Sequence, residues 1–159
     1  MNKDLSNIKL VILDVDGTLT DGGVYIDSNG IETKKFNIKD GAGIVLAEKR
    51  GIDFMILTGR SSKCVDIRAK ELNIRYVFQG ISNKLALLKC FLVEKGISPC
   101  EVAYMGDDVN DIDCMNHVGF SACPADAVEE VKHIVDYVAE HKGGYGAVRD
   151  FLNYFSKQK

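Results

Sequence analysis

The stretch LVILDVDGTLTDGG, residues 10–23, constrains the fold of this chain more than any other feature. Its apolar, β-branched start predicts a core strand over residues 8–15. Two aspartates, Asp14 and Asp16, stand one residue apart at the tip of that strand. Packing alone does not explain them, because a buried, unpaired carboxylate is costly. The stretch therefore predicts a rigid strand that carries a pair of working acids at its end.

Short apolar runs alternate with helical patterns in the chain that follows. The expected strands are 52–57, 76–78 and 102–105, and the expected helices are 61–72 and 82–95. Asp40 and Ser61 are the expected helix N-caps, and Gly51 and Gly96 the expected helix stops. This alternation predicts an α/β fold, a doubly wound parallel sheet with helices on both faces.

Residues 24–36, VYIDSNGIETKKF, interrupt the alternation. The pair Asn29-Gly30 lies between two β-rich arms, which is a strong signal for a β-hairpin. Because it follows the first strand directly, the hairpin is expected to project beyond the end of that strand. There is no internal repeat or linker, so residues 1–159 are predicted to form a single domain.

Charge and composition exclude several classes of protein. The net charge of −3 does not suggest a nucleic-acid partner or an acidic membrane surface. No apolar run approaches the ~20 residues that span a bilayer, and the start of the chain has no apolar targeting core. The five cysteines include no CxxC pair, which fits reduced thiols better than disulfides or zinc. A cytoplasmic protein is expected.

Groups capable of chemistry follow each predicted strand, and the carboxyl ends of parallel strands meet at one edge of a sheet. In chain order they are Asp14, Asp16, Thr58, Arg60, Lys84, Asp107, Asp108 and Asp111. Carboxylates this close repel one another unless a cation neutralises them, and all-oxygen ligands suit Mg²⁺. Lys84 lies at a predicted helix start, where the helix dipole disfavours a cation unless an anion is near.

Two other folds use similar residues. An EF-hand loop that began at Asp14 would need glycine at Leu19 and an acid at Tyr25, and would follow a helix. A receiver domain would combine its acidic pair with a single phosphoacceptor later in the chain, whereas DVDGT is followed here by a late GDD. Each motif alone is an ordinary turn or surface group, but the ordered set is specific.

The motifs DVDGT, LTGR, Lys84 and GDDVND resemble, in order and spacing, the four motifs of the haloacid dehalogenase superfamily of phosphohydrolases. More of the chain, including KFNIKDGAGI, FQGISNK and GGYGAVRD, is similar to the 3-deoxy-D-manno-octulosonate 8-phosphate phosphatases. The resemblance implies a Rossmann-like fold without a separate cap domain. It also implies a phosphoric monoester hydrolase that acts in lipopolysaccharide precursor synthesis.

The resemblance also implies a role for each site residue. Asp14 is the expected nucleophile, which forms an aspartyl-phosphate, and Asp16 the expected general acid and base. The implied ligands of Mg²⁺ are Asp14, the main-chain carbonyl of Asp16, and Asp107. Thr58 and Lys84 are expected to hold the phosphoryl oxygens.

Asp108 and Asp111 are expected to orient Lys84 or a water ligand. For Asp111, a helix-capping role is equally open.

The resemblance places two arginines near the substrate. Arg60 favours an octulosonate, because relatives that act on nine-carbon keto acids tend to carry glutamate there. Arg68 is expected to reach the site of a neighbouring subunit, the alternative being a solvated helix arginine. The family buries its hairpins in a homotetramer, which is the assembly expected here. Tyr145 stands where relatives often have a basic residue, so a charge contact from the tail to the substrate is in doubt.

Three functions remain open from the residues and the resemblance. The first is a magnesium-dependent octulosonate 8-phosphate phosphatase. The second has the same chemistry on a sialic-acid-like nonulosonate 9-phosphate. The third is a catalytically silent oligomeric binding module, against which the intact set of Asp14, Asp16, Lys84 and Asp107 weighs.

Overall fold

The computed structural model describes residues 5–157, with main chain alone at positions 156 and 157, and contains a six-stranded parallel sheet. In spatial order the strands are β5 (Tyr76–Phe78), β4 (Asp53–Leu57), β1 (Leu10–Leu13), β6 (Val102–Met105), β7 (Phe120–Cys123) and β8 (Tyr137–Val138). The central strand is β1, in which Leu10 lies opposite both Asp53 and Val102. The predicted doubly wound sheet is confirmed, although the pattern missed β7 and β8.

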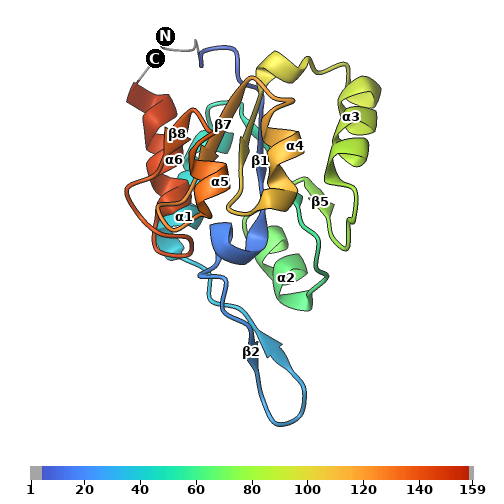
Figure 1. Ribbon diagram of the computed structural model, residues 1–159, viewed down its shortest axis with the longest axis vertical. Helices are drawn as coiled ribbons and strands as arrows, with labels where there is room; N and C mark the ends of the chain where they lie inside the picture. The colour runs from blue at the N-terminus through green and yellow to red at the C-terminus, as the bar shows by residue number, and fades with distance from the viewer. Residues whose placement is uncertain (1–4, 158–159) are drawn as a thin grey trace.

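Helices cover both faces of the sheet (Figure 1). One face carries α1 (Ile38–Glu48), α2 (Lys63–Glu71) and α6 (Ala147–Lys157). The other carries α3 (Lys84–Lys95), α4 (Ile112–Met115) and α5 (Glu129–Lys132). Three single turns complete the helical set: η1 (Val15–Leu19), η2 (Pro99–Glu101) and η3 (Val109–Asp111).

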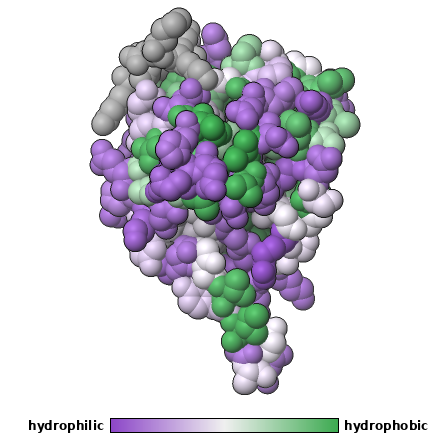
Figure 2. Space-filling model, in the orientation of Figure 1, coloured by the Kyte–Doolittle hydropathy of each residue, from purple (hydrophilic) through white to green (hydrophobic). Residues whose placement is uncertain are grey.

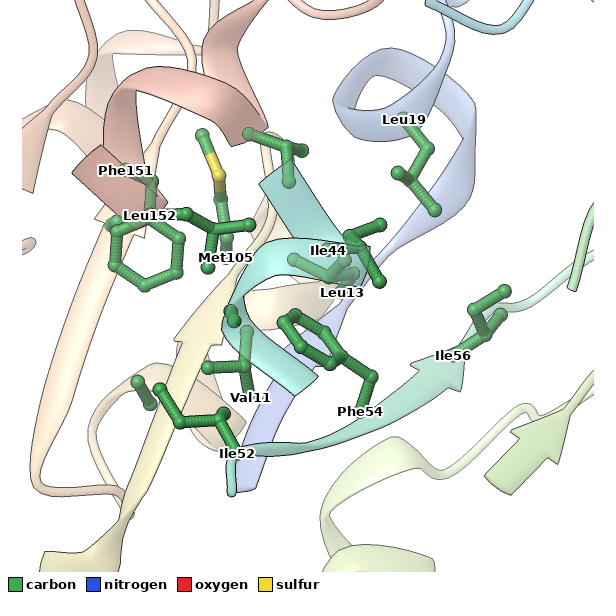
Figure 3. Packing of buried hydrophobic residues seen from close by; sticks show 14 of the residues in the cluster. Val11, Leu13, Leu19, Ile44, Ile52, Phe54, Ile56, Met105, Phe151 and Leu152 are labelled. Carbon is green, nitrogen blue, oxygen red and sulfur yellow. The ribbon is translucent and has the colours of Figure 1, made fainter. Parts of the chain in front are cut away.

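The two faces of β1 supply two separate parts of the core, because side chains alternate along a strand. Val11 and Leu13 point to the α1 and α6 side, where they pack with Ile44, Phe54 and Phe151 (Figure 3). The intervening residues of the strand join the cluster on the α3 side. Apolar packing on both faces fixes the position of the strand that carries the first acids.

The predicted helix N-caps were wrong by a few residues. Asn37 caps α1 by accepting a hydrogen bond from the Lys39 amide at 2.8 Å, and Ser62 caps α2. Asp40 lies inside α1 and is buried. The stop at Gly96 is confirmed, since it ends α3 with φ +63°, and Gly51 follows α1 with φ +86°.

The predicted hairpin is present and projects from the body of the molecule (Figure 1). Its strands are β2 (Tyr25–Ile26) and β3 (Glu32–Thr33). Figure 2 shows apolar residues gathered on this projection. Exposed apolar side chains on the hairpin are those of Val24, Tyr25, Ile26 and Ile31. An apolar surface on a projecting hairpin is a candidate contact with another chain.

Two further expectations were tested by the described residues. All five cysteines are free thiols, as predicted. Among residues 5–157, no helix combines the length and the apolar character that crossing a membrane requires.

Candidate active site

The first acids are mounted where β1 gives way to a tight turn. The Asp14 amide donates to the Met105 carbonyl at 3.0 Å, so the sheet ladder extends to this residue. The chain then enters η1, where Gly17 has φ +91°. A side chain on Gly17 would collide with the carboxylate of Asp107, so only glycine fits there. The turn ends the strand alternation at Asp14, so β1 is shorter at both ends than the predicted strand 8–15.

Lys84 joins two of the acids at the centre of the site. It is the first residue of α3, its side chain is buried, and its Nζ donates to Asp14 Oδ1 at 2.8 Å and to Asp111 Oδ1 at 2.7 Å. Burial lowers the pKa of Lys84, but the charges of Asp14 and Asp111 outweigh it and leave the pKa raised. Lys84 therefore stays charged in the site.

Asp111 combines both of the roles that the sequence left open. Its Oδ1 also accepts a hydrogen bond from the Tyr104 hydroxyl at 2.6 Å. Its Oδ2 accepts from the main-chain amides of Asp107 at 3.2 Å and Asp108 at 3.4 Å. Asp111 thus orients Lys84 and also closes the turn that follows β6.

The carboxylates of Asp14, Asp107 and Asp111 come together, each with an oxygen within 4.8 Å of the others. Burial raises the pKa of Asp14 to about 6, and repulsion from Asp111 adds to this while Lys84 opposes it. Burial and the charge of Asp14 raise the pKa of Asp107 to about 8, against a hydrogen bond from Thr18. The cluster therefore holds more negative charge than Lys84 neutralises.

The donor set fits Mg²⁺, a hard cation that takes carboxylate oxygens and keeps several waters. Four hydrogen bonds at Asp111, one of which is also the ion pair with Lys84, already use both of its oxygens. Asp14 and Asp107 are then the carboxylates best able to hold the ion.

Asp16 lies beside this cluster with different partners. Its carboxylate contacts the Lys34 ammonium and lies 3.7 Å from Arg60 Nε. Lys34 comes from the base of the hairpin, has a side chain that is 1% exposed, and also lies 3.5 Å from Glu32. The hairpin therefore supplies a buried cation to the second acid of the pair.

The remaining predicted residues differ in how far their side chains are buried. Thr58 is buried where β4 ends, and Arg60 is half-exposed, with a hydrogen bond to Glu32 at 2.7 Å. The exposed Asp108 accepts from the Val109 amide at 2.7 Å, as an N-cap. It therefore caps η3, and no hydrogen bond joins it to Lys84.

Arg68 has partners on its own chain. Its guanidinium donates to Glu71 at 2.8 Å and to the main-chain oxygen of Asn37 at 3.3 Å.

Known proteins share both this sequence and this geometry. Residues 76–152 match the haloacid dehalogenase-like hydrolases. The chain is 46% identical over 144 residues to 3-deoxy-D-manno-octulosonate 8-phosphate phosphatase KdsC of Escherichia coli strain K12, covering 91% of this chain and 77% of the relative. The chain belongs to this phosphatase family. The KdsC of Yersinia pestis is 42% identical over 145 residues, 91% of this chain and 78% of that protein.

Solved structures of related phosphatases agree with the fold. The phosphatase of Moraxella catarrhalis, in complex with a magnesium ion, a phosphate ion and a KDO molecule, has a TM-score of 0.95 and 38% identity, covering 98% of this chain and 90% of that one. A cobalt-bound phosphatase of Haemophilus influenzae has a TM-score of 0.93 and 36% identity, covering 98% and 91%. The haloacid dehalogenase resemblance and the predicted Rossmann-like fold are thereby confirmed, and both of these related structures hold a divalent cation.

The sequence reasoning about this phosphatase missed three side chains at the site. Thr18 Oγ1 donates to Asp107 Oδ1 at 3.0 Å, Lys34 contacts Asp16, and Tyr104 contacts Asp111. A hydroxyl inside DVDGT and a tyrosine two residues before GDD were the available signals. Lys34 left no such signal, because its place depends on how the hairpin folds back.

The tail segment GGYG, residues 143–146, packs on the turn that carries Asp16. The Gly144 amide donates to the Thr18 carbonyl at 3.2 Å, and a side chain on Gly143 would collide with the Gly17 carbonyl. Tyr145 is half-exposed, and its ring centroid lies 3.6 Å from Lys35 Nζ. Lys35, at the base of the hairpin, thus places a positive charge over the Tyr145 ring.

Proposed function

We propose that the chain hydrolyses 3-deoxy-D-manno-octulosonate 8-phosphate to the free sugar acid and phosphate, with Mg²⁺ as cofactor. The observation that carries the proposal is Lys84 held between Asp14 and Asp111 beside Asp107, in a chain 46% identical to phosphatases of that name. Phosphoryl transfer depends mainly on such positioning and charge stabilisation.

Asp14 is the proposed nucleophile. Its carboxylate attacks phosphorus, an aspartyl-phosphate forms, and the bond from phosphorus to the sugar oxygen breaks. Asp16 protonates that leaving oxygen and later takes a proton from the water that hydrolyses the aspartyl-phosphate. Lys34 and Arg60, which contact Asp16, keep its carboxylate at the side of the site.

Thr58 and Lys84 are the proposed ligands of the phosphoryl oxygens, with Asp111 holding Lys84 in place. Asp14, Asp107 and the main-chain carbonyl of Asp16 would hold Mg²⁺. When bound there, the ion would offset the negative charge that opposes attack on a phosphate ester.

Arg60 is the proposed contact for the sugar carboxylate. It is half-exposed beside Asp16, and its planar, permanently charged guanidinium suits a carboxylate. A nonulosonate 9-phosphate is the second candidate substrate, and Arg60 favours the octulosonate. Arg68 is proposed to serve the site of a neighbouring subunit.

We also propose a cytoplasmic homotetramer that works in lipopolysaccharide precursor synthesis. The exposed apolar surface of the hairpin supports self-association, because a two-stranded hairpin is marginally stable alone. In such an assembly a neighbouring chain would partly close each site.

Steady-state kinetics with Mg²⁺ on the octulosonate 8-phosphate and a nonulosonate 9-phosphate test the proposal. We expect kcat/KM to be at least about tenfold higher for the octulosonate, which corresponds to ~1.4 kcal/mol. The Asp14→Asn variant should lose at least about 1,000-fold in kcat, because the nucleophile is gone. A reversed preference would identify the second substrate, and hydrolysis of neither would indicate the silent binding module.

A further inference from the structure

The motif KDGAGI at the start of α1 is not used by the proposed chemistry, yet it contains a buried acid. Asp40 is 1% exposed, and its Oδ1 accepts from the Arg149 amide at 2.8 Å. That amide belongs to the first turn of α6, whose free N–H groups need acceptors. Asp40 therefore caps a helix that lies far away in the sequence.

The negative charge of Asp40 does not stabilise the folded chain. Its Oδ2 is buried without a hydrogen-bond partner among residues 5–157. Burial raises the pKa of this carboxyl to about 6, which means that folding disfavours its charged form. The charge of Asp40 therefore does not stabilise the fold, and the contribution that the structure shows is the acceptor that its side chain provides for the Arg149 amide.

Asn37, the N-cap of α1, contacts the same part of the tail as Asp40, which lies in the first turn of that helix. Its Oδ1 caps α1, while its Nδ2 donates to the Gly144 carbonyl at 3.4 Å. Asn37 and Asp40, the α1 anchor residues, thus hold both Gly144 and the start of α6. Tyr145 and Gly146, the second half of the GGYG segment, lie between these two points.

The GGYG segment also packs tightly on the turn formed by residues 15–21, which carries Asp16 and Thr18 and is called the catalytic turn here. The Gly144 amide donates to the Thr18 carbonyl, and a Cβ on Gly144 would lie 2.5 Å from the Asp21 nitrogen. The two main chains are so close that there is no room for a Cβ between them, so neither segment can shift without moving the other. A shift of GGYG would therefore displace Thr18, whose hydroxyl holds Asp107, and the neighbouring Asp16.

We propose that Asn37 and Asp40 are positioning residues of the phosphatase, which fix the catalytic turn by holding the GGYG segment against it. Gly43 is consistent with this, because a Cβ there would lie 3.0 Å from Arg149 Cδ and 3.3 Å from Leu152 Cδ1, so α1 and α6 are closely packed at this point. The inference rests on the proposed function, since the reaction supplies one of its two tests. Neither anchor residue is among the groups proposed to bind the substrate or Mg²⁺ or to react.

The sharpest variant is Asn37→Asp. Aspartate still caps α1, but it cannot donate to Gly144 and its charge repels that carbonyl. We expect kcat on the octulosonate phosphate to fall about five- to tenfold, because a displaced catalytic turn raises the barrier. KM should change less than about twofold, since ground-state binding is left intact, and the melting temperature should not fall.

A pair of variants at Asp40 separates the hydrogen bond from the charge. Asp40→Ala removes the acceptor for the Arg149 amide, and we expect the same loss of kcat as for Asn37→Asp. Asp40→Asn keeps an acceptor and removes the charge, so it should retain most of the activity. Recovery by asparagine would show that the cap, and not the charge, positions the tail.

Amide hydrogen exchange provides a test that does not depend on turnover. In Asn37→Asp and Asp40→Ala, exchange should accelerate within residues 15–21 and 141–146 while the strands β1, β4 and β6 stay protected. Asn153→Asp, on the exposed face of α6, is the matched control and should change neither exchange nor kcat.

Two results would overturn the proposal: wild-type kcat and exchange in both anchor variants, or a loss of kcat with exchange accelerated throughout the sheet. If wild-type protein hydrolyses no sugar phosphate while the local change in exchange persists, the proposed function fails and the structural link stands.

Discussion

Lys84 is the residue whose contacts tie the candidate site together. Its ammonium joins Asp14, which follows β1, to Asp111 in the turn after β6, so one side chain connects acids that follow two neighbouring strands. Without it, two buried carboxylates would face each other unpaired, which is strongly unfavourable. The same ammonium is proposed to stabilise the charge of the transferred phosphoryl group.

Lys84→Met should therefore lower kcat by about 100- to 1,000-fold, the range found when one preorganised donor is removed. Steady-state hydrolysis of the octulosonate phosphate measures it. Lys89→Met, an exposed position on the same helix, is the control and should behave like wild type. A loss below tenfold would contradict the role given to Lys84.

The acids predict an unusual dependence of stability on pH. Asp14 and Asp107 have pKa values of about 6 and 8 in the folded chain, against an ordinary value of 3.8. Between pH 3.8 and about pH 8 the folded state binds more protons than the unfolded state, so the free energy of unfolding falls as pH rises. Mg²⁺ binds the ionised carboxylates, so its stabilising effect should grow with pH.

Melting temperatures at pH 5 to 8, with a chelator or with Mg²⁺, measure this effect. We expect the chelated protein to lose stability toward pH 8 and Mg²⁺ to restore it. Asp107→Asn should weaken both changes. Chelated protein that gains stability over this range would contradict the assigned pKa shifts.

At the scale of residues, sequence reasoning located groups that stand at strand ends. Asp14, Thr58, Lys84 and Asp107 could be located because the ends of parallel strands meet at one edge. Lys34 and Thr18 could not, because their places depend on how the hairpin and the turn fold back, which no strand pattern encodes.

At the scale of elements, the strands β1, β4, β5 and β6 and the helices α2 and α3 were predictable because each has a continuous apolar pattern. The strand β7 was missed because its sequence, FSAC, has a polar residue and small side chains, and β8 has two residues. The N-cap of α1 was misplaced because Asp40, a good cap by type, accepts from α6 and not from its own helix.

The contact between GGYG and the catalytic turn can be measured with two glycines of similar conformation. Gly144 has φ +68° and Gly51 has φ +86°, so alanine is strained at both, by about 1–2 kcal/mol. A Cβ on Gly51 meets nothing within 4 Å, whereas one on Gly144 meets the main chain at Asp21. Gly144→Ala should therefore be the more destabilising variant.

Denaturant unfolding of Gly144→Ala and Gly51→Ala gives the difference directly. We expect Gly144→Ala to lose at least about 1 kcal/mol more of the free energy of unfolding, as overpacking does, and to lower kcat. Equal losses would mean that GGYG moves away at little cost.

At the scale of the whole molecule, the hairpin is a feature whose apolar side chains a single chain leaves exposed to solvent. Ile26 and Ile31 are 63% and 60% exposed on it. Ile26→Asp combined with Ile31→Asp should break the proposed tetramer, because two charges would be buried in its contact. Light scattering after size exclusion measures the mass.

Val93→Asp is the control for this experiment, since Val93 is 84% exposed on α3, away from the hairpin. It should leave the mass unchanged. If the double variant keeps the wild-type mass, the hairpin is not the contact.

The central place of β1 also has a consequence for synthesis of the chain. Leu10–Leu13 is made first, yet its hydrogen-bonding neighbours are residues 53–56 and 102–105. Until the ribosome has released β6, one edge of a fully apolar segment stays open to other chains. We expect nascent chains that stop before Val102 to depend on chaperones, so the strand that precedes the proposed nucleophile is also open to aggregation during translation.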